Sequence, residues 1–195
     1  QEVFNYATYD QPDAVRDLIG FGRPLDQVPP MLLPSVPTSV WGPMLRVVAD
    51  GLGIELDDIV EDVDRRALER TIEVDGMGTF DEGMQGAFRM QVKGMVDGAP
   101  LLVVDHVTRI DDAAVPEWPQ PEHGQGVHRV LLSGRPDLTV TIHGTDRDGD
   151  GTTAGGGNAT AANRIVNAVP AVCAAPAGPV HPFDLPLIDG RAQLR

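Results

Sequence analysis

Apolar and polar side chains alternate most clearly over residues 86–96. The apolar positions are Phe88, Met90 and Val92, and the polar positions between them are Arg89, Gln91 and Lys93. This period of two predicts a strand with one buried and one solvated face. Asp97 and Gly98 follow it and favour a hairpin turn, because both residue types tolerate a positive φ. Residues 101–110 begin as a continuous apolar run, which predicts a second strand covered on both faces.

Further strands are predicted on both sides of this hairpin. Residues 1–9 alternate moderately, and residues 57–73 mix acidic and apolar positions in a pattern typical of a twisted, interrupted strand. Residues 127–133 and 138–143 flank the segment 134–137 (Gly-Arg-Pro-Asp), which indicates a second hairpin.

A helix is predicted over residues 39–51, where apolar side chains recur at three- and four-residue spacing. These side chains are Trp41, Met44, Leu45 and Val48. Ser39 is the candidate N-cap of this helix. Residues 20–37 precede it with five prolines and two glycines, a composition that predicts an ordered loop or a lid. A shorter helix is predicted over residues 12–19 and ends at Gly20.

A terminal helix is predicted from about 158 to 169, with Asn158 as its cap and Pro170 as its end or a kink. The order of elements predicts an α+β fold, in which a largely antiparallel, mixed open sheet packs on helices. We predict that residues 1–157 form one α+β domain. Residues 158–195 are then the terminal helix and an extended tail.

Composition narrows the classes of function. The chain has 195 residues and a formal net charge of −14, which argues against nucleic acids and anionic membranes as partners. Its apolar runs are all shorter than the roughly 20 residues of a membrane span. The first residues show no signal peptide, so the cytoplasm is the expected compartment. The one cysteine, Cys173, lies between Val172 and Ala174 and is expected to be a buried structural thiol.

Binding sites for a dinucleotide or a metal are not expected in this chain. A dinucleotide cradle needs a strand, a glycine-rich turn and a helix in succession. The candidate glycine groups are Gly20–Gly22, Gly51–Gly53 and Gly155–Gly157, and none has that context in the sequence. Residues 146–151 resemble the start of an EF-hand loop, but Gly157 stands where the bidentate glutamate is required. The histidines do not show metal-ligand spacing.

Two residues are candidates for a pocket. His106 lies within an apolar strand beside Asp105, where a buried imidazole needs a partner or a function. It is either a core histidine satisfied by a neighbour or a pocket-lining residue. Trp41 lies on the apolar stripe of its helix. It belongs either to the core or to an aromatic pocket wall beneath the proline-rich loop.

Three segments carry a resemblance to a known family. They are Ile19–Pro24 (IGFGRP), Val104–Arg109 (VDHVTR) and Asn158–Pro170 (NATAANRIVNAVP). In this order they resemble the C-terminal domain of dihydrodipicolinate-reductase-like proteins, and most of all the branch of 2,4-diaminopentanoate dehydrogenase and the native amine dehydrogenases. The resemblance covers nearly the whole chain. Ala159 stands where the family usually has proline.

The resemblance implies a two-domain parent enzyme that aminates ketones reductively and oxidises amines. An N-terminal Rossmann domain would bind NAD(P), while the C-terminal domain would close the substrate pocket and form a homodimer. Residues 1–157 would then be the substrate-binding and dimerisation domain, and residues 158–195 would pack back on the Rossmann domain, which this chain lacks. The implied substrate-binding residues are Asn5, Tyr6, Trp41, His106 and Thr145.

No catalytic or cofactor-binding residue is expected among residues 1–195, and the chain by itself is expected to be inactive without its cofactor domain. Two alternatives stay open. The chain is a non-catalytic binding or assembly module of the same fold, or it belongs to a dihydrodipicolinate reductase of the lysine pathway. The Lys-x-Asp-Ala-Pro-Ser-Gly-Thr-Ala motif of that second family is not found in the sequence.

Overall fold

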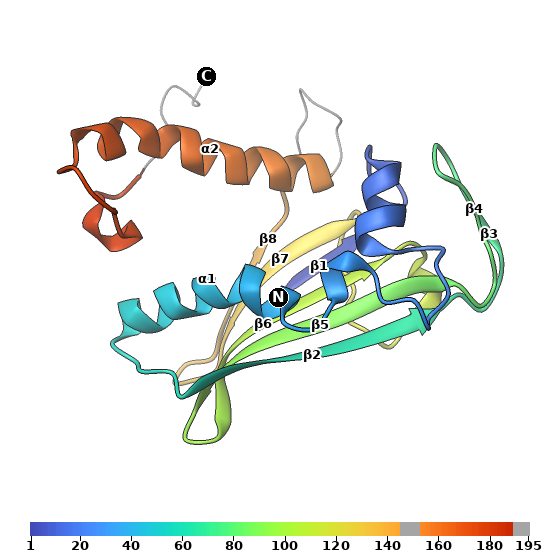
Figure 1. Ribbon diagram of the computed structural model, residues 1–195, viewed down its shortest axis with the longest axis horizontal. Coiled ribbons are helices and arrows are strands. Elements are labelled where there is room, and N and C mark those ends of the chain that lie inside the picture. The colour runs from blue at the N-terminus through green and yellow to red at the C-terminus, as the bar shows by residue number, and fades with distance from the viewer. Residues whose placement is uncertain (145–152, 189–195) are drawn as a thin grey trace.

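The computed structural model describes residues 1–144 and 153–188. Its main sheet has six strands in the order β2-β5-β6-β1-β7-β8, and β3 and β4 form a separate small hairpin (Figure 1). The strands are β1 (Glu2–Asn5), β2 (Asp58–Ala67), β3 (Ile72–Val74), β4 (Gly78–Phe80), β5 (Gln85–Val96), β6 (Ala99–Arg109), β7 (Gly126–Leu132) and β8 (Leu138–Ile142). The helical segments are η1 (Ala14–Ile19), η2 (Pro30–Leu32), α1 (Val36–Leu52), η3 (Asp112–Ala114), α2 (Thr153–Ala174) and η4 (Pro182–Asp184).

The sheet is mixed but largely antiparallel. Only the β1–β6 pair of the described sheet is parallel, and β1 lies between β6 and β7. The predicted turn between β5 and β6 is present, with φ values of 51° at Asp97 and 75° at Gly98. The hairpin of β7 and β8 is also present. The prediction of an α+β fold with a largely antiparallel mixed sheet is therefore confirmed.

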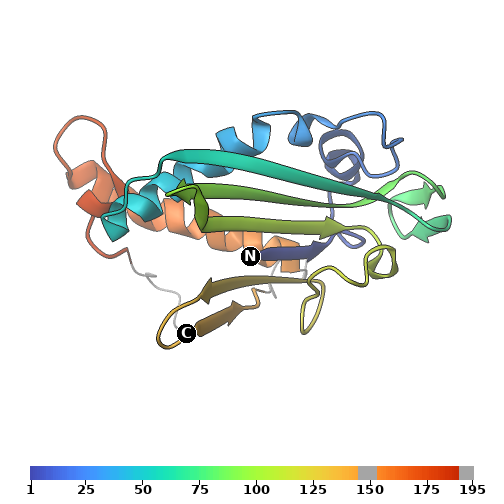
Figure 2. The ribbon, with the colours of Figure 1, turned by 90° about the horizontal axis from the view of Figure 1, so that it is seen from below.

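Helix α1 covers one face of the sheet, which we call the helical face (Figures 1 and 2). Leu45 of α1 packs there against Val92 of β5 and Val104 of β6, and Trp41 packs against the same cluster. The remaining members of the predicted stripe, Met44 and Val48, are exposed. The buried face of the helix follows Gly42, Leu45 and Ala49 instead, so only part of the predicted stripe faces the sheet.

The opposite face of the sheet has its own apolar cluster under the loop that follows β6. The cluster consists of Val3, Ala87, Val107, Val115, Trp118 and Val127. Beside it, Arg89 Nε donates to Asp105 Oδ1 over 2.7 Å and Arg89 Nη2 donates to Asp105 Oδ2 over 3.0 Å. The predicted division of residues 86–96 into a buried and a more polar face is confirmed.

Strand β6 departs from the expectation of full coverage. Its second half is buried from Val104 onward, but Leu101 and Val103 are exposed. The hairpin of β5 and β6 extends past the end of the covering layer, so an apolar run alone could not locate where coverage ends.

The N-terminus of α1 is capped differently from the prediction. The helix begins at Val36, and Ser39 lies inside it, where its hydroxyl donates to the carbonyl of Ser35 over 2.6 Å. The acceptor for the free N–H groups is Glu61 of β2, which receives hydrogen bonds from the backbone N–H groups of Ser35 (2.6 Å) and Thr38 (2.8 Å). A carboxylate from a neighbouring strand therefore replaces the local cap.

The terminal helix is longer than predicted. It begins at Thr153 rather than Asn158, and it continues through Pro170 to Ala174. A proline removes a single N–H donor, and here the helix continues for one more turn after it. Cys173 is exposed, so the expectation of a buried thiol was wrong. Among the described helices, none combines the length and the apolar character that a membrane span requires.

Two sequence predictions lie outside the described residues. Thr145, an expected substrate-binding residue, belongs to the segment 145–152, and so do residues 146–151 with their partial likeness to an EF-hand loop.

Candidate functional site

A row of three titratable side chains crosses the helical face of the sheet. Glu2 of β1 lies directly opposite His106 of β6 and, on its other side, opposite His128 of β7. Directly paired residues in a sheet point to the same face, so the three side chains gather in one place. We call Glu2, His106 and His128 the polar row.

Hydrogen bonds fix the geometry of the polar row. His106 Nδ1 is 2.8 Å from Glu2 Oε2, and His106 Nε2 is 2.7 Å from the hydroxyl of Thr108. An ionised carboxylate can only accept, so the Nδ1–H of His106 donates to Glu2. His128 Nδ1 lies 3.6 Å from the other carboxylate oxygen, Glu2 Oε1. One carboxylate is thus held between two imidazoles.

The surroundings keep Glu2 ionised. Burial by itself would raise the pKa of this carboxyl group, but the hydrogen bonds from His106 and His128, with the charges of both rings, act in the opposite direction and are stronger together. The pKa of Glu2 is therefore held far below its usual range. The carboxylate of Glu2 is therefore negatively charged at neutral pH.

Aromatic rings surround the polar row. The ring of Trp41 lies 5.7 Å from that of His106, and Phe88 stacks on His106 at the same distance. Phe4 meets His128 edge to face at 5.1 Å and lies 6.1 Å from Tyr6. An anion among aromatic rings is a suitable environment for an organic cation, because the ring faces also carry partial negative charge.

Tyr6 adds a hydroxyl group to this environment. Burial, together with the charges of Tyr9 and Glu2, raises the pKa of Tyr6 above its usual value. Its phenol therefore stays protonated at neutral pH and is able to donate a hydrogen bond.

The structure brings together three of the five residues predicted to bind substrate, namely Tyr6, Trp41 and His106. Asn5 points to the opposite face, because it follows Phe4 in strand β1 and side chains alternate. Its Oδ1 accepts from the backbone N–H of Ala7 over 2.9 Å. Thr145 lies outside the described residues.

His106 itself is the least accessible member of the row. Its side chain is 7% exposed, whereas Glu2 is 33% and His128 38% exposed. Both of its ring nitrogens have partners, so Glu2 and His128 are the groups that a ligand can reach. Sequence reasoning missed these two, since neither lies in a motif and their proximity depends on pairing between distant strands.

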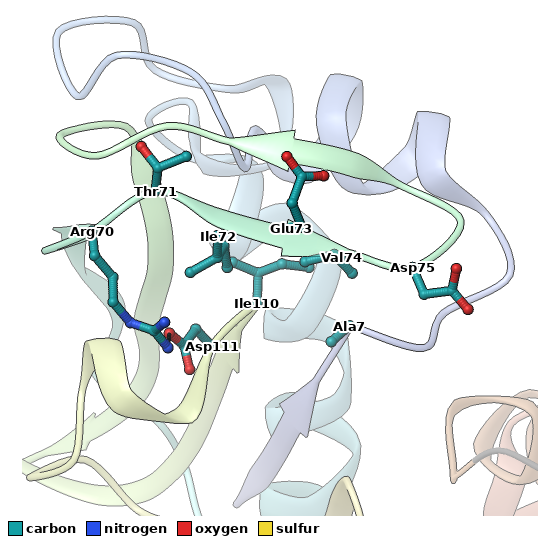
Figure 3. Close-up of a pocket in the computed structure, with 9 residues that line it drawn as sticks. All are labelled: Ala7, Arg70, Thr71, Ile72, Glu73, Val74, Asp75, Ile110 and Asp111. Carbon is teal, nitrogen blue, oxygen red and sulfur yellow. Dashed lines mark hydrogen bonds and ion pairs between the residues drawn. The ribbon is translucent and has the colours of Figure 1, made fainter.

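Two of the cavities that the described residues form lie elsewhere in the structure. The first, of about 360 Å³, lies between β3 and the end of β6 and is closed on one side by the ion pair of Arg70 and Asp111 (Figure 3). The second, of about 470 Å³, is an apolar groove between α2 and the tail, with Val169, Val172 and Leu185 among its lining residues. None of the described members of the predicted site lines either cavity.

The three glycine groups do not form a dinucleotide cradle. Gly20 and Gly22 follow the short helix η1, Gly51 and Gly53 lie at the end of α1, and Gly155–Gly157 lie within α2. A pyrophosphate is bound where a strand turns through glycines into a helix N-terminus. None of these three groups has that position, so they do not fit a nicotinamide dinucleotide.

The architecture defines a class: an α+β domain with a mixed six-stranded sheet, whose polar row lies on the face that α1 and η1 cover. Residues 42–193 match the model of the 2,4-diaminopentanoate dehydrogenase C-terminal domain, and the chain belongs to this family.

Two known amine dehydrogenases are similar to this chain. An amine dehydrogenase from Streptomyces virginiae is 50% identical over 188 residues, which are 96% of this chain and 52% of that protein. The chain thus spans about half the length of this curated relative. The solved structure of an amine dehydrogenase from Mycobacterium smegmatis matches with a TM-score of 0.53 over 81% of this chain and 41% of its own. At 18% identity this second likeness shows a shared fold alone.

Proposed function

We propose that this chain is the substrate-binding and dimerisation domain of an amine dehydrogenase, which interconverts amines and ketones with a nicotinamide cofactor in the cytoplasm. Membership of the family and the 50% identity to an amine dehydrogenase support the reaction class. The proposal includes a dihydrodipicolinate-reductase-like C-terminal fold for the sheet, which is what the sequence resemblance implies. In this proposal the chain recognises the substrate, and hydride transfer depends on a part of the parent protein that binds the cofactor.

The observation that carries the proposal is the ionised carboxylate of Glu2 on the helical face. Aliphatic amines and their imines are cations at neutral pH, so their recognition requires a negative charge in a partly dry environment. Glu2 supplies that charge, and His106 holds it in place through a bond of 2.8 Å. Water is partly excluded around it by Phe4 and Trp41, which strengthens the attraction to a cation.

The aromatic side chains would receive the apolar part of the substrate. Trp41 and Tyr6 come from α1 and from the end of β1, so they can contact substituents on different sides of the same carbon. Tyr6 stays protonated and would donate a hydrogen bond to a carbonyl oxygen. His106 acts in this proposal by positioning Glu2, since both of its nitrogens are already engaged.

The cofactor is proposed to bind outside this chain, because the described glycines do not fit a pyrophosphate. The relative from Streptomyces virginiae is about twice as long as the matched region, which leaves room for a cofactor domain. We propose that residues 158–195 pack against that domain, and that residues 1–157 bind substrate and form a homodimer. The exposed aliphatic side chains of α2, among them Ile165 and Val166, support the first contact. The boundary at 157 falls inside helix α2, so the helix would connect the two parts rigidly.

The test measures amine-dependent reduction of NAD⁺ and NADP⁺ by the protein as its gene encodes it. Glu2→Gln removes the charge and keeps the shape. We expect the KM for the amine to rise about tenfold, which corresponds to the loss of roughly 1.4 kcal/mol of binding free energy. The KM for the cofactor should not change.

Glu69→Gln is the matched control, because Glu69 is an exposed glutamate away from the polar row. An unchanged amine KM in Glu2→Gln would show that the substrate binds elsewhere. Absence of turnover with any amine would favour a non-catalytic module of the same fold. Residues 1–195 alone should fail to bind NADPH in a fluorescence titration, and tight binding would contradict the assignment of the cofactor site.

A further inference from the structure

From Val130 onward, none of the described residues covers the hairpin of β7 and β8 on either face. Every residue from Val130 to His143 is exposed. The exposed aliphatic side chains in this stretch are Val130, Leu131, Leu132, Leu138, Val140 and Ile142. A two-stranded ribbon without a packed face is only marginally stable in water, and aliphatic patches of this kind mark interaction sites.

The two edges of the six-stranded sheet are built differently. Strand β2 forms one edge, and six of its ten side chains are charged. Charged edges prevent a sheet from pairing with another chain. Strand β8 forms the other edge and has the sequence Leu-Thr-Val-Thr-Ile, without a charge or a proline. In the described part of the chain it pairs on one side only, with β7. Figure 2 shows this hairpin at the margin of the sheet.

Strand β8 is complementary to itself. Its pattern of aliphatic and threonine side chains is the same in both directions, with Val140 at the centre. A second copy in antiparallel orientation would place Leu138 opposite Ile142 and Thr139 opposite Thr141, on matching faces. One step further out, the carboxylate of Asp137 would lie opposite the imidazole of His143, which is able to donate a hydrogen bond to it.

Electrostatics also favour this hairpin as the place where two copies meet. The chain carries a formal charge of −14, so two copies repel each other over most of their surface. Residues 126–143 contain two arginines and a single acidic residue, Asp137. This hairpin therefore lacks the negative charge that would keep two copies apart.

We propose that two copies of this chain associate through antiparallel pairing of β8 with β8 of the second copy, about a twofold axis at Val140. This inference specifies the homodimer of the proposed function. The sheets of the two copies become one continuous sheet, and the aliphatic side chains of β8 on the helical face, Leu138, Val140 and Ile142, meet those of the second copy across the axis. Such an interface is isologous and closed, which prevents further growth.

The test compares two lysine substitutions in the protein as its gene encodes it. Val140 and Val130 are cross-strand neighbours on one face and are 50% and 49% exposed. In the proposed dimer the two copies of Val140 have Cβ atoms about 5 Å apart. The two copies of Val130 are separated by three strand spacings, roughly 14 Å, well beyond the screening length of about 8 Å at physiological salt.

We expect Val140→Lys to raise the dimer dissociation constant at least tenfold in sedimentation velocity, and Val130→Lys to leave it nearly unchanged. Mixing Val140→Lys with Val140→Glu should restore the dimer. A wild-type monomer, a dimer that survives Val140→Lys, or equal losses in both lysine variants would overturn the proposal. Far-UV circular dichroism checks that the variants are folded.

A second measurement does not depend on charge. Val140→Cys, in a Cys173→Ser background, should form a disulfide-linked dimer on mild oxidation, because directly opposed residues have the Cα separation that a disulfide needs. Val130→Cys should not. Failure of Val140→Cys to cross-link would overturn this interface. Amine oxidation is assayed separately, so a failure of the proposed enzyme activity is distinguishable from a failure of the interface.

Discussion

Glu61 holds the N-terminus of α1, the helix that carries Trp41 to the polar row. Its carboxylate accepts hydrogen bonds from the backbone N–H groups of Ser35 (2.6 Å) and Thr38 (2.8 Å) and from the Thr38 hydroxyl (2.5 Å). These groups are free at the start of any helix and require an acceptor. We predict that Glu61→Ala destabilises the protein measurably.

The magnitude follows from helix capping. Loss of a cap costs about 0.5–2 kcal/mol, and a negative charge at a helix N-terminus contributes a further 0.3–1 kcal/mol, roughly. Glu61 is partly exposed, so water replaces some of what is lost. We expect a decrease of about 1.5 kcal/mol in the free energy of unfolding, with a Tm lowered by roughly 3–6 °C for a chain of this size.

The stabilisation that Glu61 provides should decrease at acidic pH. Burial would raise the pKa of Glu61, but the hydrogen bonds from Thr38 and Ser35 outweigh it and lower the pKa below its usual value. The stabilisation is therefore present above the unfolded-state pKa of about 4.3 and is lost as the pH falls through the lower folded-state pKa. The difference between wild type and Glu61→Gln should be largest near neutral pH and should shrink below about pH 4.

Urea unfolding at several pH values measures these differences. Glu69→Ala is the control, because Glu69 is exposed and lies outside the cap. A double-mutant cycle with Thr38→Val should give a coupling energy of about 0.5–1 kcal/mol. A loss of less than about 0.5 kcal/mol in Glu61→Ala would be typical of an ordinary surface position. Such a small loss, together with additive effects of Glu61→Ala and Thr38→Val on the free energy of unfolding, would refute the capping argument.

Three further predictions concern packing and turns. Leu45→Ala should lower the free energy of unfolding by about 2–5 kcal/mol in urea, since the buried leucine fixes α1 on the sheet. Gly98→Ala should lower the free energy of unfolding by about 1 kcal/mol, because the φ of 75° at this position is unfavourable for a residue with a side chain. No atom lies within 4 Å of an added Cβ, so the loss would come from the backbone conformation alone. An unchanged urea midpoint would show that the turn relaxes. Arg16→Ala should speed amide hydrogen exchange in the β3–β4 hairpin roughly tenfold, because the guanidinium carbon of Arg16 lies 4.0 Å from the ring centre of Phe80 in β4. Unaltered exchange would mean that other contacts hold the hairpin.

Local features of the fold were predictable from the sequence. The alternation over residues 86–96 and the turn at Asp97 and Gly98 depend only on neighbouring residues, and both were confirmed. The start of α1 was not predictable from neighbouring residues, because its cap is Glu61, more than twenty residues away in the sequence. Ser39 has the right chemistry for a cap, but that position is already helical.

The candidate site was predictable only in part, for the same reason. Trp41 and His106 stand out as an aromatic residue and a histidine in apolar segments, and the structure places their rings 5.7 Å apart. Glu2 and His128 do not stand out in their own segments. They reach His106 through pairing of β1 with β6 and with β7, across more than a hundred residues of sequence. The sequence around Asn5 does not reveal which side chains of β1 share a face, and the pairing of β1 with β6 places Asn5 on the opposite face from Glu2.

The central place of β1 has a consequence for folding. This strand precedes the other strands of the described sheet in the sequence, yet it joins β6 to β7 and so connects the two halves of the sheet. The sheet cannot close during synthesis until residues near 130 have left the ribosome, and the closing contacts have a high contact order. Maturation of this domain should therefore be slow and late, and the unpaired β1 segment is where a chaperone would find the nascent chain exposed.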